Sequence, residues 1–259
     1  MKIAHQKQGQ KSVISRCIQK MITLTGNEYV NDVSRADLLI AIWFIGSGPK
    51  VDIPIIRWWI GSDVLSGEKG NATHNWAVAP WLVDELKERG IQSQELPILP
   101  IREPRLMALP KSPVVLTYQP KGSESLYGYD DLLKVAGAFP HITFNVLQRS
   151  GVPPLKNITF LGTIPHEQMP GIYADTSLIL RLTRHDGLSL SVLEGLSFGR
   201  QVIWTYPIGA AYYCETVDDV IETMKSIDHN QLNTVGVGYM RYFRNETIQK
   251  MTNLLLGIK

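Results

Sequence analysis

Hydrophobic and polar residues follow two recurring patterns along the chain. Short apolar runs, such as 38–44 and 53–59, are typical of buried strands. Between such runs, amphipathic stretches carry apolar residues at helical spacing, as in 13–22, and Gly26 then follows as a stop signal. This alternation is expected when crossover helices cover parallel strands, so the sequence predicts an α/β protein.

The predicted elements fall into two groups. In the first part of the chain they are strands at 2–4, 38–44 and 53–59 and helices at 13–22 and 80–90. In the second part they are strands at 114–118, 142–148, 158–161, 177–182 and 201–205 and helices at 129–138, 165–173, 189–198 and 217–227. A last helix at 239–256 is expected to pack back on the first domain.

A proline-rich segment separates the two groups. Five of the 15 prolines lie between Pro97 and Pro113, and proline holds itself and its preceding residue in extended geometry. We therefore predict a linker there, with an abbreviated Rossmann-like domain at 1–104, a second Rossmann-like domain at 105–240 and the returning helix at 241–259.

Composition and charge exclude several classes of protein. With 26 basic and 24 acidic residues, the net charge of +2 indicates no nucleic-acid partner. The first acidic residue, Glu28, follows five basic ones, which indicate either attraction to anionic lipid or a solvated helix face: Lys2, Lys7, Lys11, Arg16 and Lys20. Two cysteines form no disulfide framework, and no apolar run is long enough to span a bilayer. The interpretation is a cytoplasmic protein, with peripheral membrane contact left open.

The segment Arg184 to Ile203 carries the candidate chemistry. It leaves a predicted strand and enters a predicted helix, so Asp186 stands in a loop at the carboxyl end of that strand, where open α/β sheets bind ligands. Glu194 comes eight positions later on the helix. Helical side chains tilt toward the N-terminus, so we expect both carboxylates to face one cleft. An N-cap role for Asp186 and an exposed position for Glu194 are the alternative.

The backbone between the two acids suits a diphosphate. The free N–H groups of Gly187, Leu188, Ser189 and Leu190 would form a helix N-terminus, whose donors and dipole attract phosphate. An ionised carboxylate only accepts hydrogen bonds and matches a diol, so each acid can hold hydroxyl groups on one side of the phosphates. This spacing makes physical sense for a nucleotide sugar.

Here the sequence resembles the retaining GT-B glycosyltransferases of family four, whose signature is an acid, seven residues and a glutamate before a small-residue helix, a glycine and a buried strand. The resemblance extends over 114–217. It implies that Asp186 contacts the transferred sugar and that Glu194 binds the donor's ribose. This chain has Asp186 where the family usually has glutamate, and Ser189 where a second glycine is common, so donor geometry can differ.

The resemblance also implies where the donor's other groups bind. The family neutralises the leaving diphosphate with an arginine and a lysine after the first strand of this domain, which implies Lys121, although Tyr127-Gly128 aligns almost as well and a solvated loop lysine is the alternative. Arg149 and Arg184 are substitutes for this cation. Arg149 and Ile164 also stand in loops where the family holds the base. The implied donor is a nucleotide sugar linked to UDP or GDP, a substrate and not a cofactor.

The resemblance places the acceptor on the first domain. The segment Ile56 to Asp63 resembles the family's His-Gly-Ser/Thr-Asp region, with Ile60 in place of histidine. Trp59 and Asp63 are thus predicted to meet the acceptor, although a tryptophan in a strand is more often part of the core. Gly9 resembles a loop glycine that lets the backbone approach the substrates, and a simple turn glycine is the alternative. The acceptor itself is undefined: a glycan, a lipid or a protein.

Missing motifs narrow the reaction. The chain has no Walker loop, no Asp-x-Asp pair, no cysteine quartet and no nucleophile elbow, and Gly46-Ser47-Gly48 lacks the third glycine of a dinucleotide fingerprint. The absence of these motifs predicts no metal site and no cofactor, and the resemblance to family four implies a metal-independent transferase that retains anomeric configuration. The alternatives are a non-catalytic nucleotide-sugar or glycan-binding module, and a sugar epimerase or phosphorylase.

Overall fold

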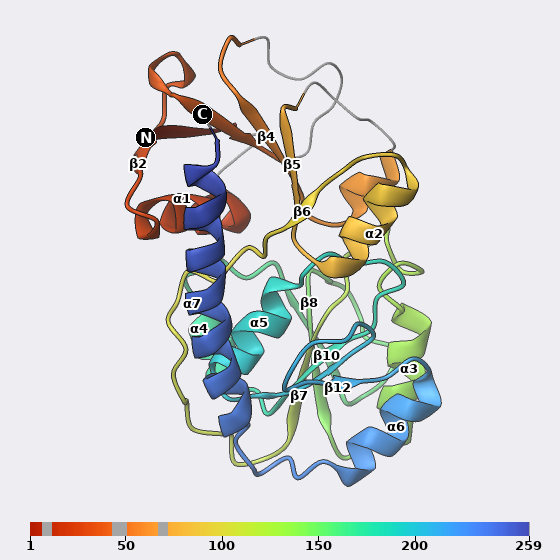
Figure 1. Cartoon of the computed structure of the whole chain (residues 1–259). Coiled ribbons are helices and arrows are strands. Elements are labelled where there is room, and N and C mark those ends of the chain that lie inside the picture. Colours follow the sequence, from red (N-terminus) through yellow and green to blue (C-terminus); the bar gives the residue numbers. More distant parts are fainter. Residues whose placement is uncertain (7–11, 43–50, 67–71, 259) are drawn as a thin grey trace. The chain divides into compact units, whose positions relative to one another are not determined.

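The computed structural model describes residues 1–6, 12–42, 51–66 and 72–258 (Figure 1). The chain forms two compact units. The first unit contains Met1–Ile101, Asp186–Leu190 and Phe243–Lys259, and the second contains Arg102–His185 and Ser191–Tyr242. The ranges predicted from the sequence are continuous, so they do not anticipate that residues 186–190 group with the first unit.

The first unit is built on a sheet of six parallel strands in the order β2-β1-β3-β4-β5-β6. The strands are β1 (Lys2–Gln6), β2 (Glu28–Val30), β3 (Leu38–Ala41), β4 (Ile55–Trp59), β5 (His74–Ala77) and β6 (Gln94–Glu95). Its helical elements are α1 (Val13–Leu24), α2 (Pro80–Glu88) and the short 3₁₀ helices η1 (Val33–Arg35) and η2 (Ser62–Ser66). All residues of β3 and β4 are buried, as expected for central parallel strands.

Local sequence explains where the helices of this unit begin. The side chain of Ser12 accepts a hydrogen bond from Ser15 N at 3.1 Å and thereby caps α1. Helix α2 starts at Pro80, whose missing N–H costs nothing in the first turn.

The second unit also contains six parallel strands, in the order β12-β11-β10-β7-β8-β9. The strands are β7 (Val114–Tyr118), β8 (Thr143–Leu147), β9 (Ile158–Gly162), β10 (Leu178–Arg181), β11 (Gln201–Trp204) and β12 (Tyr212–Tyr213). The helices are α3 (Tyr129–Ala138), α4 (Met169–Ala174), α5 (Leu190–Ser197) and α6 (Val217–Ser226). A long helix, α7 (Thr234–Leu256), starts in the second unit and ends in the first.

Different helices cover the two faces of the second sheet (Figure 1). Leu180 on β10 and Leu182 just after this strand belong to the core that α3 and α6 complete. Ile179 faces α5, because a Cβ added to Gly195 would overlap its side chain. Successive residues of a strand point to opposite faces, so Arg181 lies on the α5 face and Leu182 on the face of α3 and α6.

The strand orders mark one ligand-binding edge in each unit. Numbered within its unit, the second sheet has the order 3-2-1-4-5-6 of dinucleotide-binding folds, and the first begins 2-1-3-4-5 as in flavodoxin-like folds. In such sheets the order reverses at a switch point, and ligands bind outside the carboxyl ends of the strands there. The switch points lie between β1 and β3 and between β7 and β10.

The structure adds strands that the hydrophobic pattern does not show. Three of them, β2, β6 and β12, have only two or three residues, too few for a period to appear, and β5 begins with polar His74 and Asn75. Helix α4 is shorter than the predicted 165–173, because Pro165 starts a turn in which its carbonyl accepts from Gln168 N at 2.9 Å. In the described part of the chain, none of the helices has the length and hydropathy needed to cross a membrane.

Candidate nucleotide-sugar site

Two loops meet at the switch point of the second unit. One follows β7 and the other follows β10, and Arg184 N donates to Leu126 O between them at 2.8 Å. Gly128, the N-cap of α3, has φ +65°, and a Cβ at this position would lie 2.5 Å from Leu182 O. Glycine is therefore needed both for the left-handed backbone and for the close approach of the two loops. The edge that open α/β sheets use for ligands is fixed here by backbone contacts.

Glu194 lies inside the second unit and not on an exposed helix face. Its residue surface is 4% exposed, and both oxygens of its carboxylate accept hydrogen bonds. His166 Nε2 donates to Oε1 at 2.7 Å, and Tyr173 Oη donates to Oε2 at 2.8 Å. Burial, followed by the nearby Glu194 carboxylate, raises the pKa of Tyr173 well above its usual range, which keeps this phenol a donor.

Arg102 extends this cluster from the start of the second unit. Its Nη2 donates to His166 O at 3.0 Å, and its Nη1 lies 3.8 Å from Glu194 Oε1. A carboxylate only accepts, so His166 Nε2 is the donor to Glu194, and Arg102 Nη1 lies 3.3 Å from Nε2 and 3.4 Å from Nδ1 of the same ring. Arg102, His166 and Tyr173 thus hold the Glu194 side chain in one orientation.

Sequence reasoning missed these three partners of Glu194. Arg102 stands in the proline-rich segment that the sequence predicts as a linker, His166 precedes the short helix α4, and Tyr173 lies within that helix. Only the fold brings them to α5. The available signal was the pattern Pro165-His166 to Pro170 and Tyr173 before a buried strand, which has no chemical meaning by itself.

The three predicted cations differ in their surroundings. Lys121 is exposed in the turn after β7. Arg149 pairs with Glu124 at 3.1 Å and stacks on the ring of Tyr129, with 3.7 Å from guanidinium carbon to ring centroid. Arg184 forms an ion pair with Asp131. Two of the three are therefore already engaged by acids of their own unit.

A further cation, Arg181, was not predicted. It is 8% exposed at the end of β10, on the α5 face of the sheet, and its guanidinium lies 4.9 Å from the ring of Tyr127. It also lowers the pKa of Tyr173 against the larger effect of burial, which places its charge within electrostatic reach of the Glu194 cluster. In the sequence it is hidden inside the apolar run of β10.

The Asp186 segment groups with the first unit. Trp81 Nε1 donates to Asp186 O at 2.8 Å, and a Cβ at Gly187 would overlap the carbonyl oxygen of Ile60. Leu188 and Leu190 pack against the core of this unit, and Ser189 is buried. Glu194 belongs to the second unit, so the expectation that both acids face one cleft stays a prediction.

The residues predicted to meet the acceptor lie mostly inside the first unit. Trp59 is fully buried, donates through Nε1 to Asn75 Oδ1 at 3.1 Å and has the Arg57 guanidinium 3.4 Å above its ring. This position favours the core alternative. Asp63 is 3% exposed and accepts from Gly61 N at 2.9 Å and Ile60 N at 3.1 Å. Burial raises its pKa to about 6.

The structure adds little about two other predicted positions. Gly9 lies outside the described residues. Ile164 is half-buried in the loop after β9. Among the residues that the structure describes, no group of three or more His, Cys, Asp or Glu side chains is arranged to hold a metal ion.

The two units, each with a parallel six-stranded sheet, have the GT-B fold of two Rossmann-like domains. Among solved structures, the chain is similar to sucrose-phosphate synthase from Thermosynechococcus elongatus, with a TM-score of 0.67 and 12% identity over 96% of this chain and 79% of that one. It is also similar to WaaG, a glycosyltransferase involved in lipopolysaccharide biosynthesis, with a TM-score of 0.62 and 10% identity over 99% of this chain and 100% of that one.

Two longer proteins share the fold as well. They are TarM and the pneumococcal O-GlcNAc transferase GtfA, with TM-scores of 0.53 and 0.60 at 12% and 11% identity. The chain covers 58% of TarM and 56% of GtfA, while 96% and 85% of the chain itself is covered. No protein-family model and no curated protein matches the sequence. At these identities the likeness shows the fold.

Proposed function

We propose that the chain is a glycosyltransferase that moves a sugar from a nucleotide donor to an acceptor, with retention of configuration and without a metal ion. One observation carries the proposal: in a GT-B fold, the acid pair Asp186 and Glu194 flanks the start of α5, directly after the strand that borders the switch point of the second unit. Fold alone does not define an activity, so the argument rests on this segment.

Glu194 is assigned to the donor's ribose. A carboxylate has about four lone-pair positions, and His166 and Tyr173 each use one. The remaining positions can accept from the two hydroxyls of a ribose. The partners of Glu194 fix its direction before the nucleotide arrives, which lowers the entropy cost of binding.

The diphosphate is assigned to the N-terminus of α5 and to nearby cations. Helix α5 begins at Leu190, so the backbone N–H groups before and after it supply the donors. Lys121, exposed after β7, and Arg181, buried at the end of β10, are the cations of this unit that we assign to the departing phosphates. Such fixed positive charges replace a metal ion, because negative charge develops on the leaving group.

Asp186 is assigned to the transferred sugar. Contact with the sugar as charge develops at its anomeric carbon stabilises the transition state more than the ground state. Retention would then follow from front-face attack, in which the departing phosphate takes the proton of the acceptor hydroxyl. This mechanism comes from the resemblance to family four, and the acceptor, whether a glycan, a lipid or a protein, is left open.

A non-catalytic nucleotide-sugar or glycan-binding module is the second candidate. The observation that favours it is that Arg149 and Arg184, two of the cations considered for the leaving group, are paired with Glu124 and Asp131. A binder needs affinity for the nucleotide but no stabilisation of a leaving diphosphate. Turnover separates the two candidates: a transferase releases free nucleotide when acceptor or water is consumed, and a binder does not.

The decisive experiment measures nucleotide binding and turnover in the same two variants. Calorimetry with UDP and GDP in EDTA gives affinity, and single-turnover rates with the matching nucleotide sugars give chemistry. Glu194→Gln should weaken binding of the nucleotide about tenfold or more, because it removes a charge-assisted hydrogen bond worth roughly 1.5 to 3 kcal/mol. Asp186→Asn should keep nucleotide affinity and lower the rate.

Glu222→Gln, an exposed acid on α6, is the matched control for charge removal. Folding of each variant is checked by circular dichroism. If both folded variants bind nucleotide and turn over as the wild type does, the acid pair is structural and the proposal fails. If Glu194→Gln weakens nucleotide binding but the wild type itself shows no turnover, the result favours the binding module.

A further inference from the structure

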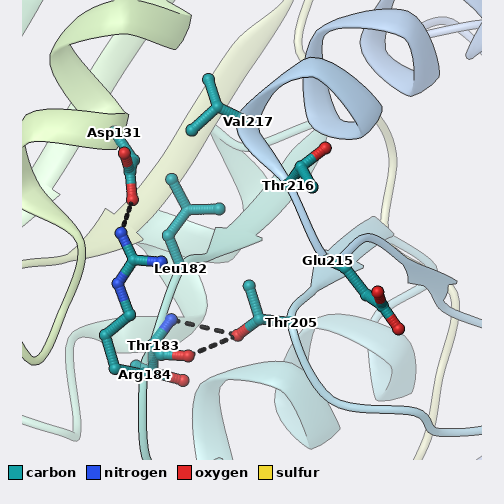
Figure 2. A pocket seen from close by; sticks show the side chains of 8 residues that line it. All are labelled: Asp131, Leu182, Thr183, Arg184, Thr205, Glu215, Thr216 and Val217. Carbon is teal, nitrogen blue, oxygen red and sulfur yellow. Dashed lines mark hydrogen bonds and ion pairs between the residues drawn. The ribbon is translucent and has the colours of Figure 1, made fainter.

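A cavity in the second unit lies on the opposite face of the sheet from Glu194. It has a volume of about 240 Å³, and Figure 2 shows its lining: Asp131, Leu182, Thr183, Arg184, Thr205, Glu215, Thr216 and Val217. Leu182 faces α3 and α6, whereas Glu194 stands on α5 at the other face. The cavity is therefore separate from the site assigned to the nucleotide.

The floor of this cavity is a fixed polar pair. Thr183 N donates to Thr205 Oγ1 at 3.1 Å, and the same hydroxyl donates to Thr183 O at 2.7 Å. These two bonds join the carboxyl ends of β10 and β11, as the dashed lines in Figure 2 show. Parallel strands present ligands to this end of the sheet, so the cavity occupies a position that such folds use for binding.

One wall carries a buried carboxylate with replaceable partners. Asp131 is 9% exposed, and its cationic neighbours Arg184 and Lys134 have side chains that are 64% and 67% exposed. An exposed cation loses little when it moves, because water solvates it. Figure 2 shows the Arg184 guanidinium bonded to Asp131, and a ligand can take hydrogen-bonding positions on Asp131 when this exposed side chain moves.

The remaining lining defines the chemistry of the occupant. The Thr216 hydroxyl caps α6 by accepting from Asp219 N at 3.1 Å, and this bond does not use its proton. Leu182 and Val217 supply an apolar wall. The charges of Asp131 and Glu215 are balanced by those of Arg184 and Lys134, so the cavity has no net positive charge to hold an anion. The Asp131 carboxylate, which can accept from hydroxyls, and the apolar wall match the hydroxyl groups and ring of a neutral sugar, whereas Glu215 already accepts from Tyr213 Oη at 2.7 Å.

We propose that this cavity binds a neutral, polyhydroxylated ligand of monosaccharide size. The size agrees, since a cavity of roughly 150 Å³ already holds benzene, and the larger volume here leaves room for ring substituents. The proposal is independent of the nucleotide-sugar site. Because Arg184 lies two residues before Asp186, an occupant in contact with Arg184 also touches the loop that carries the predicted sugar-contacting acid.

Saturation-transfer NMR on the full chain tests the proposal with D-glucose, D-galactose and N-acetyl-D-glucosamine, and with glucose 1-phosphate and glucuronate as anions. We expect at least one neutral sugar to bind, more tightly than the anions, and to stay bound when UDP or GDP is saturating. Asp131→Asn should weaken it about tenfold or more, and Asp130→Asn, a change at the exposed neighbour on the same helix turn, should not.

Val217→Phe provides a second variant, because it fills the cavity without changing a charge. It should abolish sugar binding and leave nucleotide affinity unchanged. The proposal is overturned if no neutral sugar binds, if only the anions bind, if UDP or GDP displaces the sugar, or if the sugar binds equally well to the folded Asp131→Asn and Val217→Phe proteins.

Discussion

Asp63 makes the stability of the first unit depend on pH. Its carboxylate is buried, and burial raises its pKa from 3.8 to about 6 against the opposing effects of hydrogen bonds from Ile60 N and Gly61 N and of the charge on Arg57. Between these two values the native state binds more protons than the unfolded state. The free energy of unfolding therefore falls as pH rises through this window and is level above it.

Replacing Asp63 with Asn should remove this penalty. Ile60 N and Gly61 N both donate to Oδ1 of Asp63, at 3.1 Å and 2.9 Å. The uncharged amide oxygen of an asparagine can accept the same two hydrogen bonds. One unit of pKa corresponds to about 1.4 kcal/mol, so the advantage of Asp63→Asn should grow by up to about 3 kcal/mol between pH 4 and pH 8.

Urea unfolding followed by tryptophan fluorescence measures this advantage, because Trp58, Trp59 and Trp76 are all buried in the first unit. The quantity compared is the difference between variant and wild type at each pH, which cancels the titration of other groups. Asp84→Asn, at an exposed acid on α2, is the control and should show no such trend. A flat difference for Asp63→Asn, or one that falls with pH, would refute the assignment of a raised pKa.

Four further outcomes are expected. Gly187→Ala should destabilise the first unit by about 1 to 3 kcal/mol, because the new methyl group overlaps the Ile60 carbonyl. Gly137→Ala, where a Cβ meets nothing within 4 Å, should instead stabilise the protein by about 0.5 to 1 kcal/mol. Chemical denaturation measures both changes in the free energy of unfolding. Tyr173→Phe should cost about 1 to 3 kcal/mol and weaken nucleotide binding, because Glu194 loses a buried donor; calorimetry that finds unchanged affinity would contradict its positioning role. Donor binding and turnover should survive EDTA, and a strict requirement for Mg²⁺ or Mn²⁺ would count against the proposed chemistry. Neutralising the basic residues at positions 7, 11 and 16 should reduce binding to anionic vesicles at low salt, and unchanged binding would leave the solvated-face interpretation.

The sequence predicts the strands of this fold better than its site. Runs such as 114–118 are apolar because both faces of a central parallel strand are covered, so burial alone reveals them. Single residues also predict where some helices begin, as Pro80 does for α2. The short edge strands escape detection because pairing with a neighbour, and not a hydrophobic period, makes β6 and β12 extended.

The candidate site depends on contacts that no spacing encodes. Glu194 is found from its distance to Asp186 along the chain, but its buried position follows from His166 and Tyr173, which lie 28 and 21 positions away. The buried position of Trp59 and the backbone contacts of Asp63 likewise depend on partners in space. A motif therefore identifies the segment that carries the chemistry, and packing decides which of its side chains can reach a ligand.

The division of the chain has a practical consequence for dissecting the protein. Residues 186–190 and 243–259 group with the first unit, although nearly all the sequence between 102 and 242 belongs to the second. A fragment cut at the proline-rich segment would lack Met251 and Leu255, which are buried in the core of the first unit. Expression of residues 1–101 alone should therefore give a first unit with an incomplete interior, whereas the chain from position 102 onward retains the core of the second unit.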